Sequence, residues 1–245
     1  MSIEIISTGE SSLLLPQINH QLIKLVKPEW FEIDFWQQQN AVTGQSKGRH
    51  ITWFIGNQDD EWVLRHYYRG GFMAKLTKDK FWFRSLEQTR SYQELSLLSQ
   101  MFQQGLPVPK PIVGQVIRSG FFYRSDIIIE KIPHTKTVAQ YLNSSAMPEA
   151  LWHILGGMIA KFHQAGIFHS DLNIHNILIN QQEDFWLIDF DKCESRSVKR
   201  SWQQANLARL KRSFVKEVQL GRINHFAQQQ WQWLLYGYRQ FQHKK

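Results

Sequence analysis

The sequence predicts an α+β fold in two parts, a β-rich first part over residues 1–132 and a mainly helical second part over residues 133–245. Strand-like apolar segments and one strong helix pattern occupy the first part. In the second part, apolar residues recur at helical spacing in four segments, at 137–142, 148–165, 202–220 and 226–241. The polar stretch "PHTKT" at 133–137 is expected to join the two parts.

Turn residues bound the strand-like segments of the first part. "ITWFIG" (51–56) and "EWVLRHYY" (61–68) flank the polar turn "NQDD". Residues 112–132 contain two further apolar segments around a Ser-Gly turn. We expect four strands here, arranged as two pairs.

The helix of the first part is predicted over residues 86–105. Its apolar residues share one face, and Gly105 supplies the stop signal. A shorter helix is expected within residues 19–39. The small residues of "GQSKGRH" (44–50) are expected to form a turn between apolar segments.

Composition restricts the class of protein. The chain has 245 residues with 42% hydrophobic and 20% charged, and it holds no apolar run of about 18 residues. Cys193 is the only cysteine, so no intramolecular disulfide is possible, and the N-terminus lacks the features of a secretory signal. These features favour a cytosolic compartment. The net charge of +8 favours an anionic partner.

Polar residues lie at the ends of two short apolar segments in the second part. "FHSDLNIHNILIN" (168–180) carries Asp171 and Asn176, and the apolar run of "FWLIDFDKC" (185–193) ends on Asp189. If the two runs pair as a hairpin, Asn176 and Asp189 emerge at the same end. Amide and carboxylate oxygens are ligands that Mg²⁺ accepts, which leaves Asp171 to accept a proton.

This division of roles suits phosphoryl transfer, which needs a metal, positioning and a base near the attacking hydroxyl. The residues follow the pattern H-R-D-L-x-x-x-N and then D-F-G, as His169-Ser-Asp171-Leu-x-x-x-Asn176 and Asp189-Phe-Asp. The alternative is a hairpin with polar caps. His169 is expected to hold the loop by hydrogen bonding, and His175 to be an ordinary loop side chain.

The nucleotide-holding residues of such a site are sought upstream. Gly44 and Gly48 offer a short glycine-bearing turn over phosphates, and Arg65 in "WVLRHY" stands where the pattern V-A-I-K has its lysine. Arginine keeps the charge and binds phosphate oxygens in a fork. Glu94, on the predicted helix, is the expected partner of Arg65. His66 is a rival for the same position if the register differs by one residue.

The chain resembles the protein-kinase-like superfamily. Within it, the chain is most similar to the bacterial lipopolysaccharide kinases that phosphorylate 3-deoxy-D-manno-octulosonic acid (Kdo). The segments "GQSKGR", "LRHYYRGGFMAKLTKDKFWF", "ELSLLSQMFQQGLPVPKPI", "FHSDLNIHNILI", "WLIDFDKCE" and "NLARLKRSF" carry the resemblance over about residues 44–215. The resemblance implies a protein-kinase-like two-lobe fold, with a β-rich N-lobe containing one regulatory-type helix and a mainly helical C-lobe.

The resemblance also implies an activity and its partners. It implies phosphorylation of the 4-OH of Kdo on a Kdo–lipid A precursor, with ATP and Mg²⁺, by a peripheral protein on the cytoplasmic side of the inner membrane. Asp171 would be the base, and Asn176 and Asp189 the metal ligands. Arg65 and Glu94 would hold the ATP phosphates and the helix. The nucleotide-binding set would comprise Gly44, Gly48, Arg65, Glu130 and Ile132. No nucleic acid and no obligate protein partner are expected.

The sequence departs from the pattern in having Arg65 in place of the lysine and a short glycine-bearing turn, and it departs at two further positions. Ser170 replaces the arginine that often docks a phosphorylated activation loop, so control of that kind is not expected. Asp191 replaces the glycine of D-F-G, where it would add a metal ligand or bind the sugar acid.

Other functions fit the sequence less well. A protein kinase needs more than the 56 residues that follow Asp189, and no A-P-E sequence occurs among them. Aminoglycoside or choline kinases bind cations, whereas residues 195–222 carry eight Lys/Arg and one Glu. A nucleic-acid-binding module leaves the three polar site residues unexplained. A pseudokinase is disfavoured because the base and both metal ligands are present.

The basic segment "SWQQANLARLKRSFVKEVQL" (201–220) predicts a helix with two faces. Leu207, Leu210, Phe214 and Val218 form an apolar stripe that is expected to pack into the core. Arg209, Lys211, Arg212 and Lys216 lie off the stripe, where they are expected to contact anionic lipid at a membrane surface.

Overall fold

The computed structural model describes residues 2–47, 51–56, 60–69 and 79–243. The chain divides into two compact units, which are described separately. The first comprises residues 1–103 and 109–132, and the second comprises residues 104–108 and 133–245.

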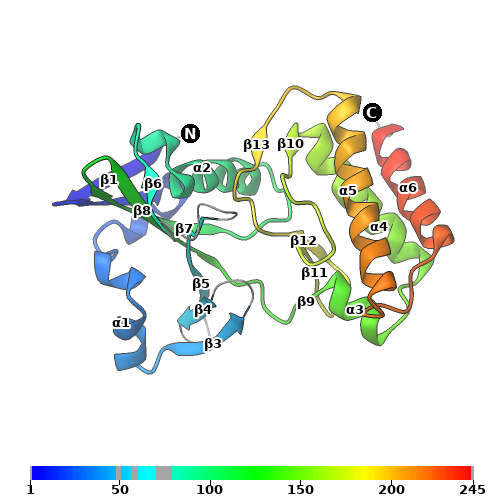
Figure 1. The fold of residues 1–245 in the computed structure, drawn as a ribbon, viewed down its shortest axis with the longest axis horizontal. Helices are drawn as coiled ribbons and strands as arrows, with labels where there is room; N and C mark the ends of the chain where they lie inside the picture. The colour runs from blue at the N-terminus through cyan, green and yellow to red at the C-terminus, as the bar shows by residue number, and fades with distance from the viewer. Residues whose placement is uncertain (1, 48–50, 57–59, 70–78, 244–245) are drawn as a thin grey trace. The chain divides into compact units, whose positions relative to one another are not determined.

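The first unit is built on an antiparallel sheet, drawn in blue to green in Figure 1. Its strands are β1 (Ile3–Thr8), β2 (Ser11–Pro16), β3 (Val42–Lys47), β4 (Ile51–Gly56), β5 (Glu61–His66), β6 (Phe81–Trp82), β7 (Pro111–Ser119) and β8 (Phe122–Glu130). The strand order is β1-β2-β7-β8-β5-β4-β3, and β6 pairs with the outer part of β8. The helices of this unit are η1 (Gln17–Leu22), η2 (Pro28–Phe31), α1 (Ile33–Gln38), η4 (Leu86–Gln88) and α2 (Arg90–Gln103).

The central strands β2, β7 and β8 each bury a continuous run of residues. Trp30, Trp36 and Trp62 contact one another and join Leu13 and Leu15 in one apolar cluster. The three tryptophans contribute much of the buried apolar area of this cluster, because aromatic side chains bury more area than aliphatic ones. Helix α2 packs on the sheet at Gly114, where a Cβ atom would lie 2.5 Å from Leu95 Cδ1.

The strands predicted at 51–56, 61–68 and 112–132 are confirmed, and so is the helix predicted at 86–105, which begins at Arg90 after a short 3-10 turn. The hairpin β1–β2 was missed. The turn predicted at 44–50 was wrong for residues 44–47, which extend β3 and pair with β4. The predicted helix within 19–39 is reduced to 3-10 turns and α1, because Pro28 interrupts the run.

The second unit is mainly helical. Its helices are α3 (Val138–Ser144), α4 (Glu149–Gln164), α5 (Arg200–Gln219) and α6 (Gln228–His243). Its short strands are β9 (Lys136–Thr137), β10 (Ile167–Phe168), β11 (Ile177–Ile179), β12 (Phe185–Leu187) and β13 (Glu194–Ser195). The strands form two small sheets, β12-β11-β9 and β10-β13. The four predicted helices are confirmed within two residues at each end.

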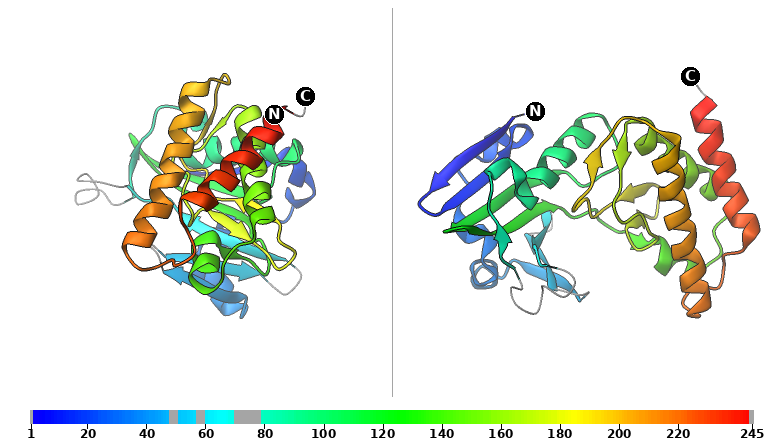
Figure 2. Two further views of the ribbon diagram at one scale, coloured as in Figure 1. Left: turned by 90° about the vertical axis from the view of Figure 1, so that its right-hand side faces the viewer. Right: turned by 45° about the horizontal axis from the view of Figure 1, so that its top comes forward.

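Helices α4 and α6 approach each other closely, as Figures 1 and 2 show. Two glycines make this possible. A Cβ atom at Gly156 would lie 2.0 Å from the carbonyl oxygen of Leu234, and one at Gly237 would lie 2.1 Å from that of His153. Glycine at both positions therefore lets the two backbones touch directly.

The chain thus has a mixed fold of an antiparallel sheet and several helices. Among the described residues, no helix combines the length and the hydrophobicity that crossing a bilayer requires.

Candidate active site

The hairpin β11–β12 sets two of the predicted site residues at one end. Ile177 pairs with Leu187 in antiparallel register, so Asn176 and Asp189 each stand just outside the paired region. The Ile188 N–H donates to the Asn176 carbonyl at 3.0 Å and prolongs the contact. The prediction that a hairpin brings these two positions together is confirmed.

The chain turns sharply at Asp189. Its φ is 66°, in the left-handed region that residues other than glycine rarely adopt. Beyond the turn, Ser170 Oγ donates to the Asp191 carbonyl at 2.9 Å, and the Ser170 N–H donates to Cys193 Sγ at 3.2 Å. The serine that replaces the usual arginine of the motif therefore binds the segment after Asp189 to the loop.

Side-chain amides organise the loop between His169 and Asn176. Asn173 Nδ2 and Asn176 Nδ2 both donate to the Asp171 carbonyl, each at 3.0 Å. Asn173 Oδ1 accepts from the backbone N–H groups of His175 and Asn176 at 2.8 and 3.2 Å. These contacts fix the backbone on both sides of the Asp171 carboxylate.

His169 supports the loop from beneath, as expected. It is 2% exposed, its Nδ1 accepts from the Asp171 N–H at 3.2 Å, and its Nε2 lies 3.1 Å from the Ile188 carbonyl. A carbonyl can only accept, so the ring proton resides on Nε2. Burial lowers the pKa of His169, which keeps the ring neutral.

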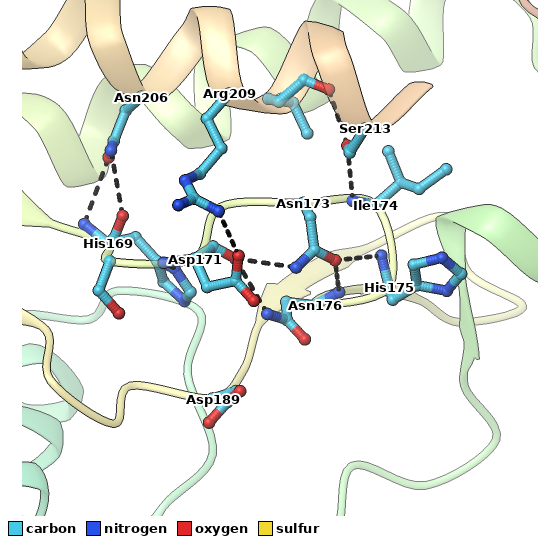
Figure 3. Close-up of polar contacts among 12 residues, drawn as sticks. His169, Asp171, Asn173, Ile174, His175, Asn176, Asp189, Asn206, Arg209 and Ser213 are labelled. Atoms are coloured by element: carbon cyan, nitrogen blue, oxygen red, sulfur yellow. Dashed lines mark hydrogen bonds and ion pairs between the residues drawn. The ribbon is translucent and has the colours of Figure 1, made fainter. Parts of the chain in front are cut away.

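Helix α5 holds the same loop through a stripe of polar residues that sequence reasoning missed (Figure 3). Asn206 Oδ1 accepts from the His169 N–H at 3.3 Å, and its Nδ2 donates to the His169 carbonyl at 3.0 Å. Ser213 Oγ accepts from the Ile174 N–H at 3.2 Å. The stripe that contacts the loop, at helical spacing, is Asn206, Arg209, Ser213 and Glu217. Gln203, one turn earlier, donates to the His163 carbonyl on α4 instead. The sequence feature that could have revealed this contact is the recurrence of polar residues at helical spacing beside the apolar stripe.

Arg209 occupies the centre of this stripe. Its Nη1 lies 2.6 Å from Asp171 Oδ1, with side chains 46% and 53% exposed. Arg209 was expected to face lipid as one of four cations. Its guanidinium also pairs with the carboxylate predicted to act as the base, and its contact with lipid stays a prediction. Lys211 is also partly engaged, by Gln228 Oε1 at 3.1 Å and by the ring of Trp231.

The rest of the α5 prediction holds with one exception. Leu207, Leu210 and Phe214 are buried as expected. Val218 is 39% exposed, so its predicted place in the core was wrong. Glu217 is buried instead and lies 3.3 Å from His175 Nε2. His175 is therefore more than an ordinary loop side chain, because it is tied to α5.

The donor set at the loop fits a magnesium ion. Asn176 Nδ2 donates to the Asp171 carbonyl, so Oδ1 of the same amide points away from that carbonyl and could act as a metal ligand. In Figure 3, Asn176 and Asp189 lie on the side of the loop away from α5. An amide oxygen and a carboxylate are hard ligands, and Mg²⁺ commonly takes only one or two protein ligands beside water and phosphate. The residues present therefore suit the metal that the sequence predicted.

The predicted contact between Arg65 and Glu94 is present in the first unit. Arg65 Nη2 lies 2.5 Å from Glu94 Oε1 and 2.6 Å from Oε2. Glu94 on α2 is 3% exposed and also accepts from the Tyr67 hydroxyl at 2.6 Å. A buried carboxylate is costly unless it is paired, so this arrangement ties α2 firmly to β5.

His66, the rival for the place of Arg65, has other partners. Its Nδ1 lies 2.6 Å from Asp126 Oδ1, and its Nε2 lies 3.4 Å from Asp79 Oδ2. Burial opposes protonation of the ring, but the hydrogen bond and charge of Asp126, aided by Asp79, raise the pKa of His66. Arg65 is therefore the residue paired with Glu94. Gly48, of the expected nucleotide set, lies outside the described residues.

The other expected nucleotide-binding residues are placed as follows. Gly44 lies in β3, where a Cβ atom would lie 3.2 Å from the Phe54 ring. Glu130 ends β8, and its Oε2 accepts from the Lys110 N–H at 3.2 Å. Ile132 is 9% exposed and ends the first unit. Their contact with a nucleotide stays a prediction.

Comparison with known proteins adds the following. Residues 33–238 match the model of the lipopolysaccharide kinase (Kdo/WaaP) family. The chain is 47% identical over 216 residues to a "3-deoxy-D-manno-octulosonic acid kinase" of Mannheimia succiniciproducens, covering 85% of this chain and 89% of that protein. Proteins of the same name are similar from Vibrio cholerae, at 46% with 76% and 78% covered, and from Haemophilus influenzae, at 44% with 86% and 90% covered. The chain belongs to the lipopolysaccharide kinase (Kdo/WaaP) family.

Proposed function

We propose that this protein is a Kdo kinase, which transfers the γ-phosphoryl group of ATP to the 4-OH of a Kdo residue on a Kdo–lipid A precursor. The names of its relatives support the activity. The observation that carries the proposal is the joint fixation of Asp171, Asn176 and Asp189, by hairpin β11–β12 on one side and helix α5 on the other. This set matches the parts that phosphoryl transfer needs.

In the proposed reaction, the sugar hydroxyl oxygen bonds to the γ-phosphorus while the bond from that phosphorus to the β–γ bridging oxygen breaks. The Asp171 carboxylate takes the hydroxyl proton, and ADP leaves. Asn176 and Asp189 would hold Mg²⁺, which neutralises charge on the phosphate oxygens when bound. The backbone contacts around Asp171 keep its carboxylate in place, which limits the entropy lost on reaching the transition state.

The first unit would supply the nucleotide-holding residues. Arg65, paired with Glu94, would bring its positive charge to the phosphate oxygens. Gly44, Gly48, Glu130 and Ile132 complete the proposed nucleotide set. The two units would then correspond to the two lobes of a protein-kinase-like fold, divided at residues 132 and 133.

The proposed acceptor also sets the location. A Kdo–lipid A precursor is anchored by its acyl chains, so the enzyme would work as a peripheral protein on the cytoplasmic side of the inner membrane. The net charge of +8 favours such an anionic surface.

The experiment is a transfer assay with labelled ATP and Mg²⁺. Acceptors carrying one and two Kdo residues are compared in detergent, followed by location of the phosphate on the product. Phosphate on the Kdo 4-OH is expected. An aminoglycoside, choline and a generic peptide serve as control acceptors, and labelling of any of these in place of Kdo would refute the proposal.

A further inference from the structure

Three large aromatic side chains are exposed together at one end of the sheet in the first unit. Trp82 is 57% exposed, Phe121 72% and Phe122 36%. The rings of Trp82 and Phe121 stack with centroids 5.8 Å apart and an angle of 8°, and Phe122 meets Trp82 edge-on at 5.4 Å. We refer to Trp82, Phe121 and Phe122 as the aromatic tip.

The exposure follows from strand alternation. In the pairing of β6 with β8, Phe81 lies opposite Tyr123 and both turn inward, their rings 5.4 Å apart. Trp82 lies opposite Phe122, so the period of two turns both outward. Phe121 stands on the turn between β7 and β8. Solitary exposed apolar residues are common, but a stacked group of three is not and indicates a contact surface.

Cations surround the aromatic tip. Lys80 and Arg84 flank β6 and Arg124 stands on β8, and all three are exposed. Arg118 on β7 does not belong to this group, because it lies opposite the inward-facing Tyr123 and its guanidinium carbon lies 4.5 Å from the centroid of the Phe83 ring.

The acidic residues of the adjoining segments are Glu10, Asp79 and Glu87. Of these, Asp79 lies 3.5 Å from Arg124 Nε and 3.4 Å from His66 Nε2, so its charge is largely compensated. The Glu10 carbonyl accepts from the Arg118 N–H. Glu10 lines the other face together with Arg118 and Phe83. Lys80, Arg84 and Arg124 against Asp79 and Glu87 leave the rim with a surplus of one positive charge.

We propose that the aromatic tip and its basic rim form the surface that docks on an anionic lipid bilayer. Aromatic side chains prefer the boundary between headgroups and acyl chains, and arginine and lysine bind the lipid phosphates. The proposal rests on the proposed function, in which the acceptor is a membrane lipid. It adds a second surface to the expected cationic face of α5, on which Arg209 and Lys211 have partners within the protein.

Charge favours the bilayer over a second copy of this chain. Two copies meeting at their aromatic tips would bring two basic rims together, which is unfavourable. An anionic lipid surface complements the rim and also accepts the rings. Added salt should weaken the electrostatic attraction between the basic rim and the lipid phosphates, and it should leave the contribution of the aromatic rings to bilayer binding unchanged.

The test uses the full chain and flotation with vesicles of phosphatidylethanolamine and phosphatidylglycerol, without ATP or acceptor. Phe121→Ser and Trp82→Ser should each lower the partition coefficient roughly tenfold, because each loses apolar area that the bilayer buries. Lys80→Gln with Arg84→Gln should weaken binding to these vesicles at low salt, with little change on phosphatidylcholine vesicles. Leu25→Ser is the matched control, since Leu25 is 61% exposed in the same unit.

A phosphoryl-transfer assay with two forms of the acceptor distinguishes a defect in docking from a defect in catalysis. The aromatic variants should retain turnover with acceptor dispersed in detergent and lose it with acceptor embedded in vesicles. Unchanged vesicle binding in folded Phe121→Ser and Trp82→Ser, or a wild-type dimer that Trp82→Ser dissociates in place of vesicle binding, would overturn the docking proposal. No transfer to Kdo–lipid A in detergent by the wild type would instead overturn the proposed function and leave the docking result intact.

Discussion

Arg209, on helix α5, places its Nη1 atom 2.6 Å from Oδ1 of Asp171, 38 residues earlier in the chain. Both side chains are about half exposed, so the pair adds little to the free energy of unfolding. Its effect is expected in catalysis, because a charge-assisted hydrogen bond fixes the orientation of the carboxylate that accepts the proton. We interpret Arg209 as a positioning residue.

Arg209→Gln should lower kcat about tenfold with little change in KM for ATP, because a misplaced base loses part of its advantage. The loss should vanish in an Asp171→Ala background, where there is no carboxylate to position. Steady-state kinetics of the two single variants and the double variant measure this. Arg212→Gln, on the exposed side of the same helix, is the control. Equal losses from Arg209→Gln with and without Asp171 would contradict the positioning role.

Arg65 and Glu94 should behave as a coupled pair in ATP binding. Arg65→Ala and Glu94→Ala should each weaken it, and the double variant should lose less than the sum, with a coupling of roughly 1–3 kcal/mol. Titration calorimetry with an ATP analogue gives the four affinities. His66→Ala should show no coupling to Glu94→Ala, since His66 contacts Asp126. Strict additivity for Arg65 and Glu94 would exclude a joint role.

The contact of α4 with α6 predicts a difference between adjacent glycines. Gly156→Ala should destabilise the second unit by roughly 1–3 kcal/mol or more, because its Cβ would overlap the α6 backbone. Gly157→Ala is the matched control, since the nearest atom would be 3.9 Å away. It should be neutral or stabilise by up to about 1 kcal/mol, as alanine favours a helix more than glycine. Chemical denaturation gives the free energy of unfolding of both variants. Similar losses of stability in the two would contradict the packing account.

Stability should fall in mild acid because of His163. Burial lowers its pKa from 6.5 to about 4, while its Nδ1 lies 2.8 Å from the Tyr238 hydroxyl. As the pH falls, His163 is therefore protonated in the unfolded chain at a higher pH than in the folded chain. His163 contributes stability above pH 6.5 that is lost progressively as the pH falls to about 4, and amounts to roughly 3 kcal/mol.

His163→Gln should flatten the dependence of unfolding free energy on pH between about 4 and 6.5. His169, whose pKa burial also lowers, should leave a residual slope of the same sign. The measurement is denaturant unfolding at several pH values, with His153→Gln on the same helix as the control. An unchanged slope in His163→Gln would assign the acid sensitivity elsewhere.

The parts of the site that were predictable depend on local spacing. Asn176 and Asp189 flank two short strands joined by a tight turn, so pairing alone fixes their relation. Arg65 and Glu94 were predictable from their order along a strand and a helix. The short hairpin β1–β2 was missed because Leu13, Leu14 and Leu15 form a continuous buried run without alternation.

The contribution of α5 was not predicted, because it depends on contacts between residues nearly 40 positions apart. Asn206 reaches His169 and Arg209 reaches Asp171 only once the apolar stripe of α5 has packed. The sequence places both residues beside that stripe, where buried polar and solvated polar positions look alike. Val218 was misjudged because it continues the apolar spacing into the last turn of α5, where it is 39% exposed.

The turnover of Asp171→Ala with saturating ATP and Kdo–lipid A tests the account most directly. A positioned base contributes roughly 10²–10⁴-fold to the rate and little to nucleotide affinity, so kcat should fall by that factor while ATP binding is retained. Asp184→Ala, an exposed carboxylate on the turn of the same hairpin, should keep full activity. A kcat near the wild-type value in Asp171→Ala would contradict the assignment of Asp171 as the base.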